Sequence, residues 1–354
     1  MQIDFHHTTT YIVARDAGFN HQDAEIIAYA SQYVDDATLA GPIHFDNGAA
    51  YNRINSAHNM IDLRNENEIA NHNVWIPFHF LPGNGNMQAD QNPLGSFINK
   101  IICTPDSPVA QEMLSDTILE QHRNYGLHRL GISLHVYADT WAHQGFAGVQ
   151  HLINEVEHAQ ETDNYGIFTP LVGQLLRNLL DDTIPPLGHA RAQIFPDMPF
   201  LNWQYKNGSG DLITRNNPVD FLAACDKMCF WMRRYLLKNP HADVTGLSNE
   251  TRKQIKQMFS QTLFERGEDR HQTWLAAIRT GFFTQFSSLS IKDYATRGAQ
   301  SWKYAALGSS EDQAEYHYQT TFLTSNWKLF HDALQAHRFN VIYNILPKYG
   351  ICAA

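Results

Sequence analysis

Cysteine is scarce in this sequence, with only four residues in 354, at Cys103, Cys225, Cys229 and Cys352. Thiols so few and so scattered exclude a disulfide framework in a chain of this length, and we expect them to be reduced. Cys225 and Cys229 lie four residues apart in FLAACDKMCFWMRRYLL, whose apolar residues follow a helical period. This pattern favours packing in the core over a metal site.

Long apolar runs are missing as well, although apolar residues make up 43% of the chain. Without a run of about 18 apolar residues, no transmembrane helix is predicted. The first ten residues, MQIDFHHTTT, lack the basic and apolar regions of a signal peptide. We therefore expect a soluble protein, cytoplasmic as written or exported by a route without a classical signal peptide.

Basic residues are outnumbered: 26 Lys and Arg face 36 Asp and Glu, which gives a net charge of −10. Binding to nucleic acid or to an anionic membrane depends on a basic surface that releases counterions, so this balance disfavours both. A bound cluster of cations would reverse this negative charge locally. The oligomeric state is left open by the sequence.

Histidine, by contrast, is abundant. There are 19 histidines, and 14 of them lie between His6 and His189. This concentration points to metal or acid–base chemistry in the first half of the chain.

Helical periodicity recurs along the chain, whereas no convincing alternation of apolar and polar residues typical of a strand is evident. We predict an all-α, multi-helix body: residues 1–200 form a metal-binding helical core, and residues 201–354 a helical extension packed on it as one continuous domain. Residues 41–108, rich in Asn, Gly and Pro, read as a long loop that covers a site. Helices are expected over TTTYIVARDAG, over NHQDAEIIAYASQYVDD with Asn20 as its N-cap, at about 108–124, 124–147 and 169–182, and in four amphipathic segments beyond 217.

The segment GISLHVYADTWAHQGFAG carries His135, Asp139 and His143 at intervals of four residues. Four residues advance a helix by about 6 Å and rotate it by about 40°, so the three side chains form one slowly drifting stripe. The two histidines lie too far apart for one ion, which favours two adjacent ions with Asp139 between them. Ordinary surface His–Asp pairs are the alternative, but the small neighbours Ala138 and Ala142 let the stripe face inward.

One helix cannot complete a metal site, and further candidate ligands lie elsewhere in the sequence. Asp35 and Asp36 end the second expected helix, where two acids oppose the helix dipole unless a cation is bound; a solvated acidic end is the alternative. His6 precedes the first helix, and His79 lies between two phenylalanines, as a ligand or as a core histidine. Weaker candidates are His189 with Asp197, and His151 with Glu155.

An early histidine, an acid that ends the following helix, a loop histidine and then HVYADTWAH resemble the zinc-dependent phospholipase C and S1/P1 nuclease superfamily. Its members are helical, hold three zinc ions and cleave phosphoester bonds. In its sequence motifs the chain also resembles an uncharacterised bacterial family. That family carries FHxxxTYxxA, AxASQYVDD, WIPFHFLPG and LGIxLHxYADTWAHQGF, with a later GHA and PDxP. These motifs stand here at Phe5–His6, Ala28–Asp36, Trp75–Gly83, Leu130–Phe146 and Gly188–Pro199.

The resemblance implies a zinc site of two or three ions, in which Asp36 or Asp35 would be the bridging aspartate and Asp36 would orient or deprotonate the attacking water. The last ligand would be His189, or the pair His151 and Glu155. Two features depart from the superfamily: its members use an N-terminal tryptophan as a zinc ligand where this chain has Met1, and the step from the HxxxD aspartate to the next histidine is two residues shorter here. The remaining ligands implied are His6, His79, His135, Asp139 and His143.

A small phosphoester or phospholipid is the substrate class that this resemblance implies. Trp75, Phe78, Phe80 and Trp141 are aromatic residues that could line a lipid-accommodating cleft, stack on bases or simply fill the core. We rank a phospholipase C-like phosphodiesterase first, a nuclease of S1/P1 type second, and a non-catalytic metal-stabilised interaction protein third. An HD phosphohydrolase is disfavoured, because the other metal-binding residues of that enzyme class are missing near the single His-Asp dipeptide at 331–332.

Overall fold

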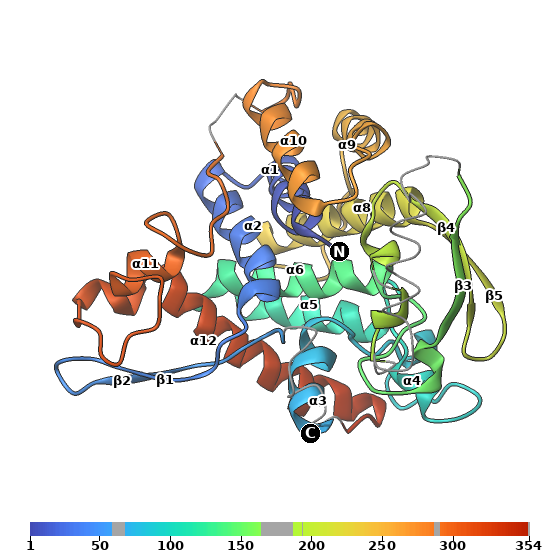
Figure 1. Ribbon diagram of the computed structural model, residues 1–354, viewed down its shortest axis with the longest axis horizontal. Helices are drawn as coiled ribbons and strands as arrows, with labels where there is room; N and C mark the ends of the chain where they lie inside the picture. The colour runs from blue at the N-terminus through green and yellow to red at the C-terminus, as the bar shows by residue number, and fades with distance from the viewer. Residues whose placement is uncertain (59–67, 164–186, 193, 287–290, 353–354) are drawn as a thin grey trace.

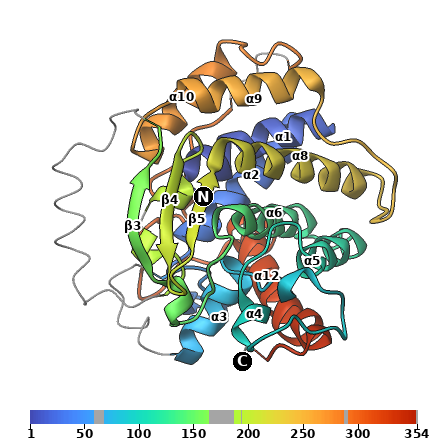
Figure 2. The ribbon, with the colours of Figure 1, turned by 90° about the vertical axis from the view of Figure 1, so that its right-hand side faces the viewer.

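The computed structural model describes residues 1–58, 68–163, 187–192, 194–286 and 291–352. Helix α6 (Gly126–Ala142) runs through the centre of the fold, and other helices pack around it, as Figures 1 and 2 show. Nearly every side chain of α6 is buried, because neighbours cover it on all sides. These neighbours are α2 (His21–Asp36), α5 (Pro108–Leu119), α8 (Asn217–Leu236) and α12 (Asn326–Phe339).

Further elements complete the helical part. Near the N-terminus lies a π-helix, η1 (Asp4–Thr9), which continues into α1 (Thr10–Ala17). The other helices among the described residues are α3 (Glu68–Phe78), α4 (Ile98–Ile101), α9 (Asn249–Gln261), α10 (Gly267–Arg279), α11 (Trp302–Leu307) and the π-helix η8 (Asn340–Ile345). Short 3-10 turns are η3 (Asn84–Asn86), η4 (Leu152–Asn154), η5 (Ala190–Ala192), η6 (Phe195–Asp197), η7 (Thr320–Thr324) and η9 (Leu346–Tyr349).

Helix α2 begins and ends where local chemistry predicts. The Asn20 side chain accepts a hydrogen bond from the backbone N–H of Asp23 at 2.9 Å, as an N-cap does, and the last residue of the helix is Asp36. On its inner face α2 approaches α6 closely at Gly131, where a Cβ atom would lie 2.5 Å from the carbonyl oxygen of Ile27. The absence of a side chain at residue 131 therefore allows the two helices to meet.

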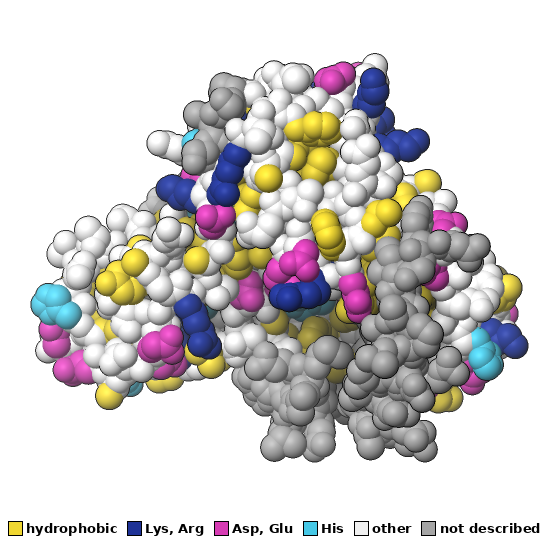
Figure 3. Space-filling model, turned by 45° about the horizontal axis from the view of Figure 1, so that its top comes forward, with side chains coloured by type: hydrophobic (Ala, Val, Ile, Leu, Met, Phe, Trp, Pro, Cys, Tyr) yellow, Lys and Arg dark blue, Asp and Glu magenta, His cyan; other side chains and the backbone are white. Residues whose placement is uncertain are grey.

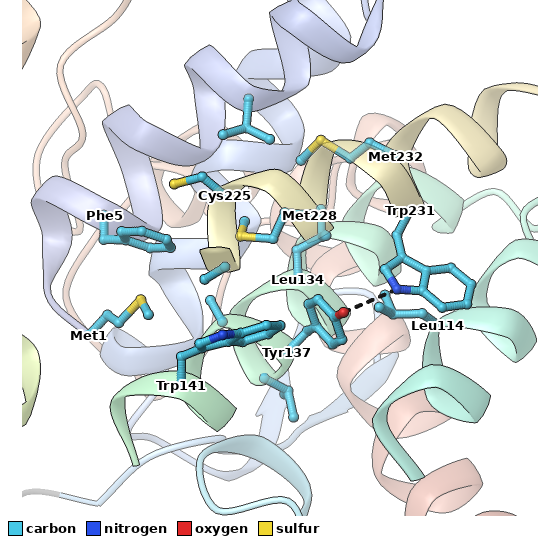
Figure 4. Close-up of a cluster of buried hydrophobic side chains, with 14 of the residues drawn as sticks. Met1, Phe5, Leu114, Leu134, Tyr137, Trp141, Cys225, Met228, Trp231 and Met232 are labelled. Carbon is cyan, nitrogen blue, oxygen red and sulfur yellow. Dashed lines mark hydrogen bonds between the residues drawn. The ribbon is translucent and has the colours of Figure 1, made fainter. Parts of the chain in front are cut away.

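The main hydrophobic core spans both halves of the chain. It contains residues from Met1 at the start to Ile351 near the end, so residues 1–200 and 201–354 share one core. Figure 4 shows Met1, Phe5 and Trp141 packed in one part of this core. A second cluster joins α2, α11 and α12, and a third surrounds β4 (Asn202–Asn207).

The prediction of an all-α fold is wrong, because the structure is a mixed α/β fold with two antiparallel sheets. One sheet pairs β1 (Gly41–His44) with β2 (Ala50–Arg53), inside the segment expected to be a long loop. The other has the order β3-β4-β5, formed by β3 (Val156–Glu161), β4 and β5 (Leu212–Asn216).

In the strands of the second sheet, the alternation of apolar and polar residues extends over only a few positions. The helical periodicity of the surrounding sequence therefore dominated the prediction. Trp203 and Tyr205 alternate with polar residues and are buried, and the NGSGD turn that follows connects β4 to β5. Residues 41–108 also contain α3, so that segment is not a single loop. The helix expected at 169–182 lies outside the described residues. None of the helices in the described part of the chain is long and apolar enough to cross a membrane.

Candidate metal centre

Eight candidate ligands from distant parts of the sequence meet beside α6. His135 and Asp139 lie on α6 itself, and His143 follows its last residue. The other five come from η1, the end of α2, the residue after α3 and the segment before β4. They are His6, Asp35, His79, His189 and Asp197.

Asp139 lies at the centre of this arrangement and is 1% exposed. Its Oδ1 atom is 3.2 Å from Nε2 of His6, and its Oδ2 atom is 3.3 Å from Nε2 of His135 and 3.5 Å from Nδ1 of His79. The Nδ1 atom of His143 lies at 3.7 Å from Oδ2. One carboxylate therefore faces four imidazoles that come from three separate segments.

The donor atoms form three groups that could each hold an ion. Within each group the nitrogen and oxygen atoms lie within 4.8 Å of one another. His135 belongs to both of the first two groups, and the third lies at the end of α6. The groups are His6, Asp35 and His135; His79, His135 and Asp139; and His143, His189 and Asp197.

Two histidines are held with one ring nitrogen facing the centre. The Nε2 atom of His79 donates to the backbone carbonyl of Ser56 at 2.9 Å, which leaves Nδ1 to face Asp139. The Nδ1 atom of His143 donates to the backbone carbonyl of His79 at 2.7 Å, which leaves Nε2 to face Asp197. A carbonyl can only accept, so these bonds fix the tautomer of each ring, as the outer hydrogen bonds of metal-binding histidines do.

Ser56 also connects this bond to α2. Its hydroxyl donates to the carbonyl of Val34 at 2.6 Å, and its backbone N–H donates to the carbonyl of Ala37 at 2.9 Å. The residue that orients His79 is thus fixed to the end of the helix that carries Asp35.

Several of the central imidazole nitrogens have no hydrogen-bond partner among the described residues. Neither ring nitrogen of His6 makes a hydrogen bond, and the same holds for Nε2 of His143; all three atoms are buried. Buried polar atoms without hydrogen bonds are costly and rare in native proteins. Metal ions held by these nitrogens would satisfy them, so the residues fit a metal centre.

The charges of the protein itself shift the pKa values at this centre. Burial alone would raise the pKa of Asp139, but the Met1 ammonium group and the histidines around it hold that pKa well below its usual range. Burial lowers the pKa of His6 to about 4, so this imidazole is neutral at pH 7 and can act as a ligand. Burial and the nearby charge of Asp139 raise the pKa of Asp35 well above its usual range.

The amino group of Met1 is a further charged group at the centre, and side-chain patterns in the sequence do not indicate it. It lies 2.8 Å from Oδ1 of Asp139 and 3.1 Å from Oδ1 of Asp197, and it is buried. Despite the opposing effect of burial, these two carboxylates raise the pKa of the amino group to about 11. A backbone amine leaves no signal in side-chain patterns; the N-terminal ligand of the resembled superfamily was the available hint.

A cavity of about 580 Å³ opens onto these residues. Trp75 and Phe80 form part of its wall, and the ring of Phe80 stacks on His143 with centroids 4.5 Å apart. Glu265, Arg266 and Glu268, at the start of α10, lie at its edge. Figure 3 shows a basic side chain flanked by acidic ones above a hollow in which histidine is visible.

Other predicted site residues lie apart from the three groups. Asp36, predicted to be the catalytic residue, instead accepts hydrogen bonds from the Tyr294 hydroxyl at 2.6 Å and from Nε2 of Gln32 at 3.1 Å. Asp35, not Asp36, is the aspartate that α2 brings to the centre, at 3.7 Å from Nε2 of His135. The helix rotates by about 100° per residue, so neighbouring acids cannot point the same way.

The pair His151 and Glu155 also lies apart from the three groups. His151 is exposed, and its Nδ1 atom accepts a bond from the backbone N–H of Ile153. Glu155 forms an ion pair with Arg191 at 3.7 Å. Of the two alternatives for the last ligand, the structure therefore brings His189, with Asp197, into the site.

Comparison with known proteins gives one match. The sequence pattern of the family of unknown function DUF6765 matches residues 1–345. No curated protein and no solved structure matches the chain.

Proposed function

The chain belongs to the DUF6765 family, and we propose that it is a zinc-dependent phosphoester hydrolase that acts on small phosphodiesters or phospholipids in the manner of a phospholipase C. The observation that carries this proposal is the pair of hydrogen bonds from His79 and His143 to backbone carbonyls. They leave one nitrogen of each ring directed at carboxylates in a cavity, which is the arrangement that metal-binding histidines require.

The donor set matches zinc. It consists of imidazole nitrogens and carboxylate oxygens without thiols, and zinc binds both kinds of donor at short distances. Three neighbouring donor groups, two of which share His135, suit two or three ions close together. Zinc bound there would act as a Lewis acid and lower the pKa of a coordinated water toward neutrality.

The protein residues would orient the reactants. Asp139 shares its two oxygens between neighbouring histidines and so fixes their relative positions. The side chain of Asp35 is 32% exposed and lines the cavity, where its carboxylate can hold and accept the proton of an attacking water. Trp75 and Phe80 cover the histidines on one side and limit the access of bulk water.

The walls of the cavity favour a small ester over a nucleic acid. A volume of about 580 Å³ holds a ligand of metabolite size. Arg266 is the single Lys or Arg among the described lining residues, and Glu265 and Glu268 next to it would repel a polyanion. The apolar side chains of Leu187 and Ile194 could instead contact the apolar part of a phosphodiester.

Two measurements test the proposal. Elemental analysis of the purified protein is expected to find zinc, and the protein is then assayed with phosphatidylcholine, a generic phosphodiester and single-stranded DNA. We expect hydrolysis of one of the first two, its loss with a chelator, and its recovery with zinc. His143→Ala should lose both metal and activity, and His151→Ala, a histidine outside the three groups, should keep both.

Each other outcome has a defined meaning. Zinc-dependent cleavage of DNA alone would replace the proposed substrate with a nucleic acid. Bound zinc without any hydrolysis would indicate a metal-stabilised interaction protein. Full activity of a metal-free protein would refute the metal centre.

A further inference from the structure

Helix α10 contacts the amino-terminal segment, more than 250 residues before it in the sequence, through one buried ion pair. The guanidinium of Arg270 donates from Nε to Oδ2 of Asp4 at 2.7 Å and from Nη2 to Oδ1 of Asp4 at 3.2 Å. The two side chains are 0% and 1% exposed. Asp4 belongs to η1, two residues before His6, and Figure 1 shows the N-terminus between α10 and α6.

The remaining donors of Arg270 bind two other segments. Its Nη2 atom also donates to Oε1 of Gln2 at 2.6 Å, next to Met1. Its Nη1 atom donates to the carbonyls of Phe264 at 2.7 Å and Glu265 at 2.8 Å, at the edge of the cavity. One planar guanidinium therefore fixes η1, the first residues of the chain and the edge of the cavity relative to each other.

A second contact joins the same two elements. The Nδ1 atom of His7 lies 2.9 Å from Nε2 of His271, and both rings are buried. At the start of α10, a Cβ atom on Gly267 would lie 2.6 Å from Oε1 of Gln2, so the absence of a side chain there leaves room for the Gln2 amide. Residues 267, 270 and 271 thus hold residues 2, 4 and 7, on both sides of His6.

We propose that Arg270, through Asp4, is a positioning residue of the metal centre: it holds the segment that brings His6 and the Met1 nitrogen to Asp139, and it sets the edge of the cavity at the same time. The part of this inference that concerns metal affinity rests on the proposed function. Residues 264–271 then belong to the functional site, although they lie far outside the first 200 residues.

A purely stabilising role would not require this pair. When two charged side chains are fully buried, the free energy lost by removing them from water offsets much of their mutual attraction. Apolar side chains of similar size often stabilise a fold equally well. What apolar residues cannot do is fix three segments by directed hydrogen bonds. Arg270 makes hydrogen bonds of that directed kind to all three segments, and its guanidinium also lies 5.9 Å from the ring centroid of Phe200.

The test compares Arg270→Lys with Arg53→Lys. Both substitutions keep the charge and remove a bidentate pair, because Arg53 binds the two oxygens of Asp312 at 2.8 and 2.6 Å, outside the three donor groups. Zinc affinity is measured by competition with a chromogenic chelator. We expect Arg270→Lys to weaken zinc binding about 10–100-fold, as changes in residues that orient ligands do, and Arg53→Lys to leave it unchanged.

A second readout does not depend on zinc. Hydrogen exchange of the backbone amides of residues 4–9 is measured in the chelated proteins, and we expect it to accelerate in Arg270→Lys and not in Arg53→Lys. If Arg270→Lys fails to fold, Gln2→Ala, which removes one bond to the guanidinium, should show the same changes on a severalfold scale.

The outcomes separate this inference from the proposed function. Equal zinc affinity and equal exchange in wild type and Arg270→Lys would overturn it, as would equal losses in the Arg53→Lys control. If the wild type binds no zinc, the proposed function fails; exchange at residues 4–9 then decides whether Arg270 positions this segment.

Discussion

The Nδ1 atom of His143 donates a 2.7 Å hydrogen bond to the backbone carbonyl of His79. The donor follows α6 and the acceptor follows α3, so one bond joins two segments that are 64 residues apart. Because His79 in turn donates to the carbonyl of Ser56, the two imidazoles form a chain with fixed tautomers. The other nitrogen of each ring faces a carboxylate, Asp139 for His79 and Asp197 for His143.

The structure distinguishes the two neighbouring aspartates of α2 in a way that mutation can check. Asp35→Asn removes an oxygen that faces His135 and His79, so we expect weaker zinc binding and at least about a hundredfold loss of activity. Asp36→Asn, whose side chain is bonded to Tyr294 and Gln32, is the matched control and should retain zinc. Zinc titration and initial rates measure the difference; the reverse order of effects would restore Asp36 as the ligand.

The close approach of α2 and α6 should couple stability to metal binding. In Gly131→Ala the new methyl group would meet the carbonyl of Ile27 and the Cβ of Ala30, and we expect the free energy of unfolding to fall by about 1–3 kcal/mol. Zinc affinity should fall too, because separating the helices moves Asp35 away from His135. Denaturant unfolding and zinc competition measure both quantities.

The control for this substitution is Gly281→Ala. Residue 281 has a φ of +78° and open space around it, so alanine strains the backbone without touching the helices. We expect lower stability with unchanged zinc affinity. If Gly131→Ala behaves in the same way, the contact between the helices does not position the site.

Acid should destabilise the fold through a histidine outside the metal centre. Burial lowers the pKa of His331 to about 3, whereas an unfolded histidine has a pKa near 6.5. Between these values the unfolded state binds more protons, so stability falls as the pH drops from about 6.5 toward 3, by about 1.4 kcal/mol per pH unit for one such group.

His331→Gln should make the pH dependence of the unfolding free energy shallower by up to that amount. His241→Gln, at an exposed position, serves as the control and should leave the slope unchanged. Both slopes are obtained from denaturant unfolding of chelated protein between pH 4 and 7. Identical slopes for wild type and His331→Gln would contradict a neutral buried imidazole at this position.

Local sequence chemistry predicted several features well. The Asn20 cap and the end of α2 at Asp36 follow from interactions between residues three or four apart, which a sequence displays directly. The same holds for the stripe on α6, where Asp139 lies within 4 Å of both His135 and His143. The hairpin of β4 and β5 was missed, because its two buried aromatic residues form too short an alternation to outweigh the helical pattern around it.

The sequence by itself determined the chemistry of this protein: many histidines, few cysteines, an acidic balance, and a helix that presents His135, Asp139 and His143 together. These features depend on residue type and on the fixed rotation of a helix. Tertiary structure alone decided that Asp35 and not Asp36 joins them, that the Met1 nitrogen lies beside Asp139, and that Arg270 holds Asp4. Such contacts depend on how helices distant in sequence rotate and pack, and no local pattern specifies that.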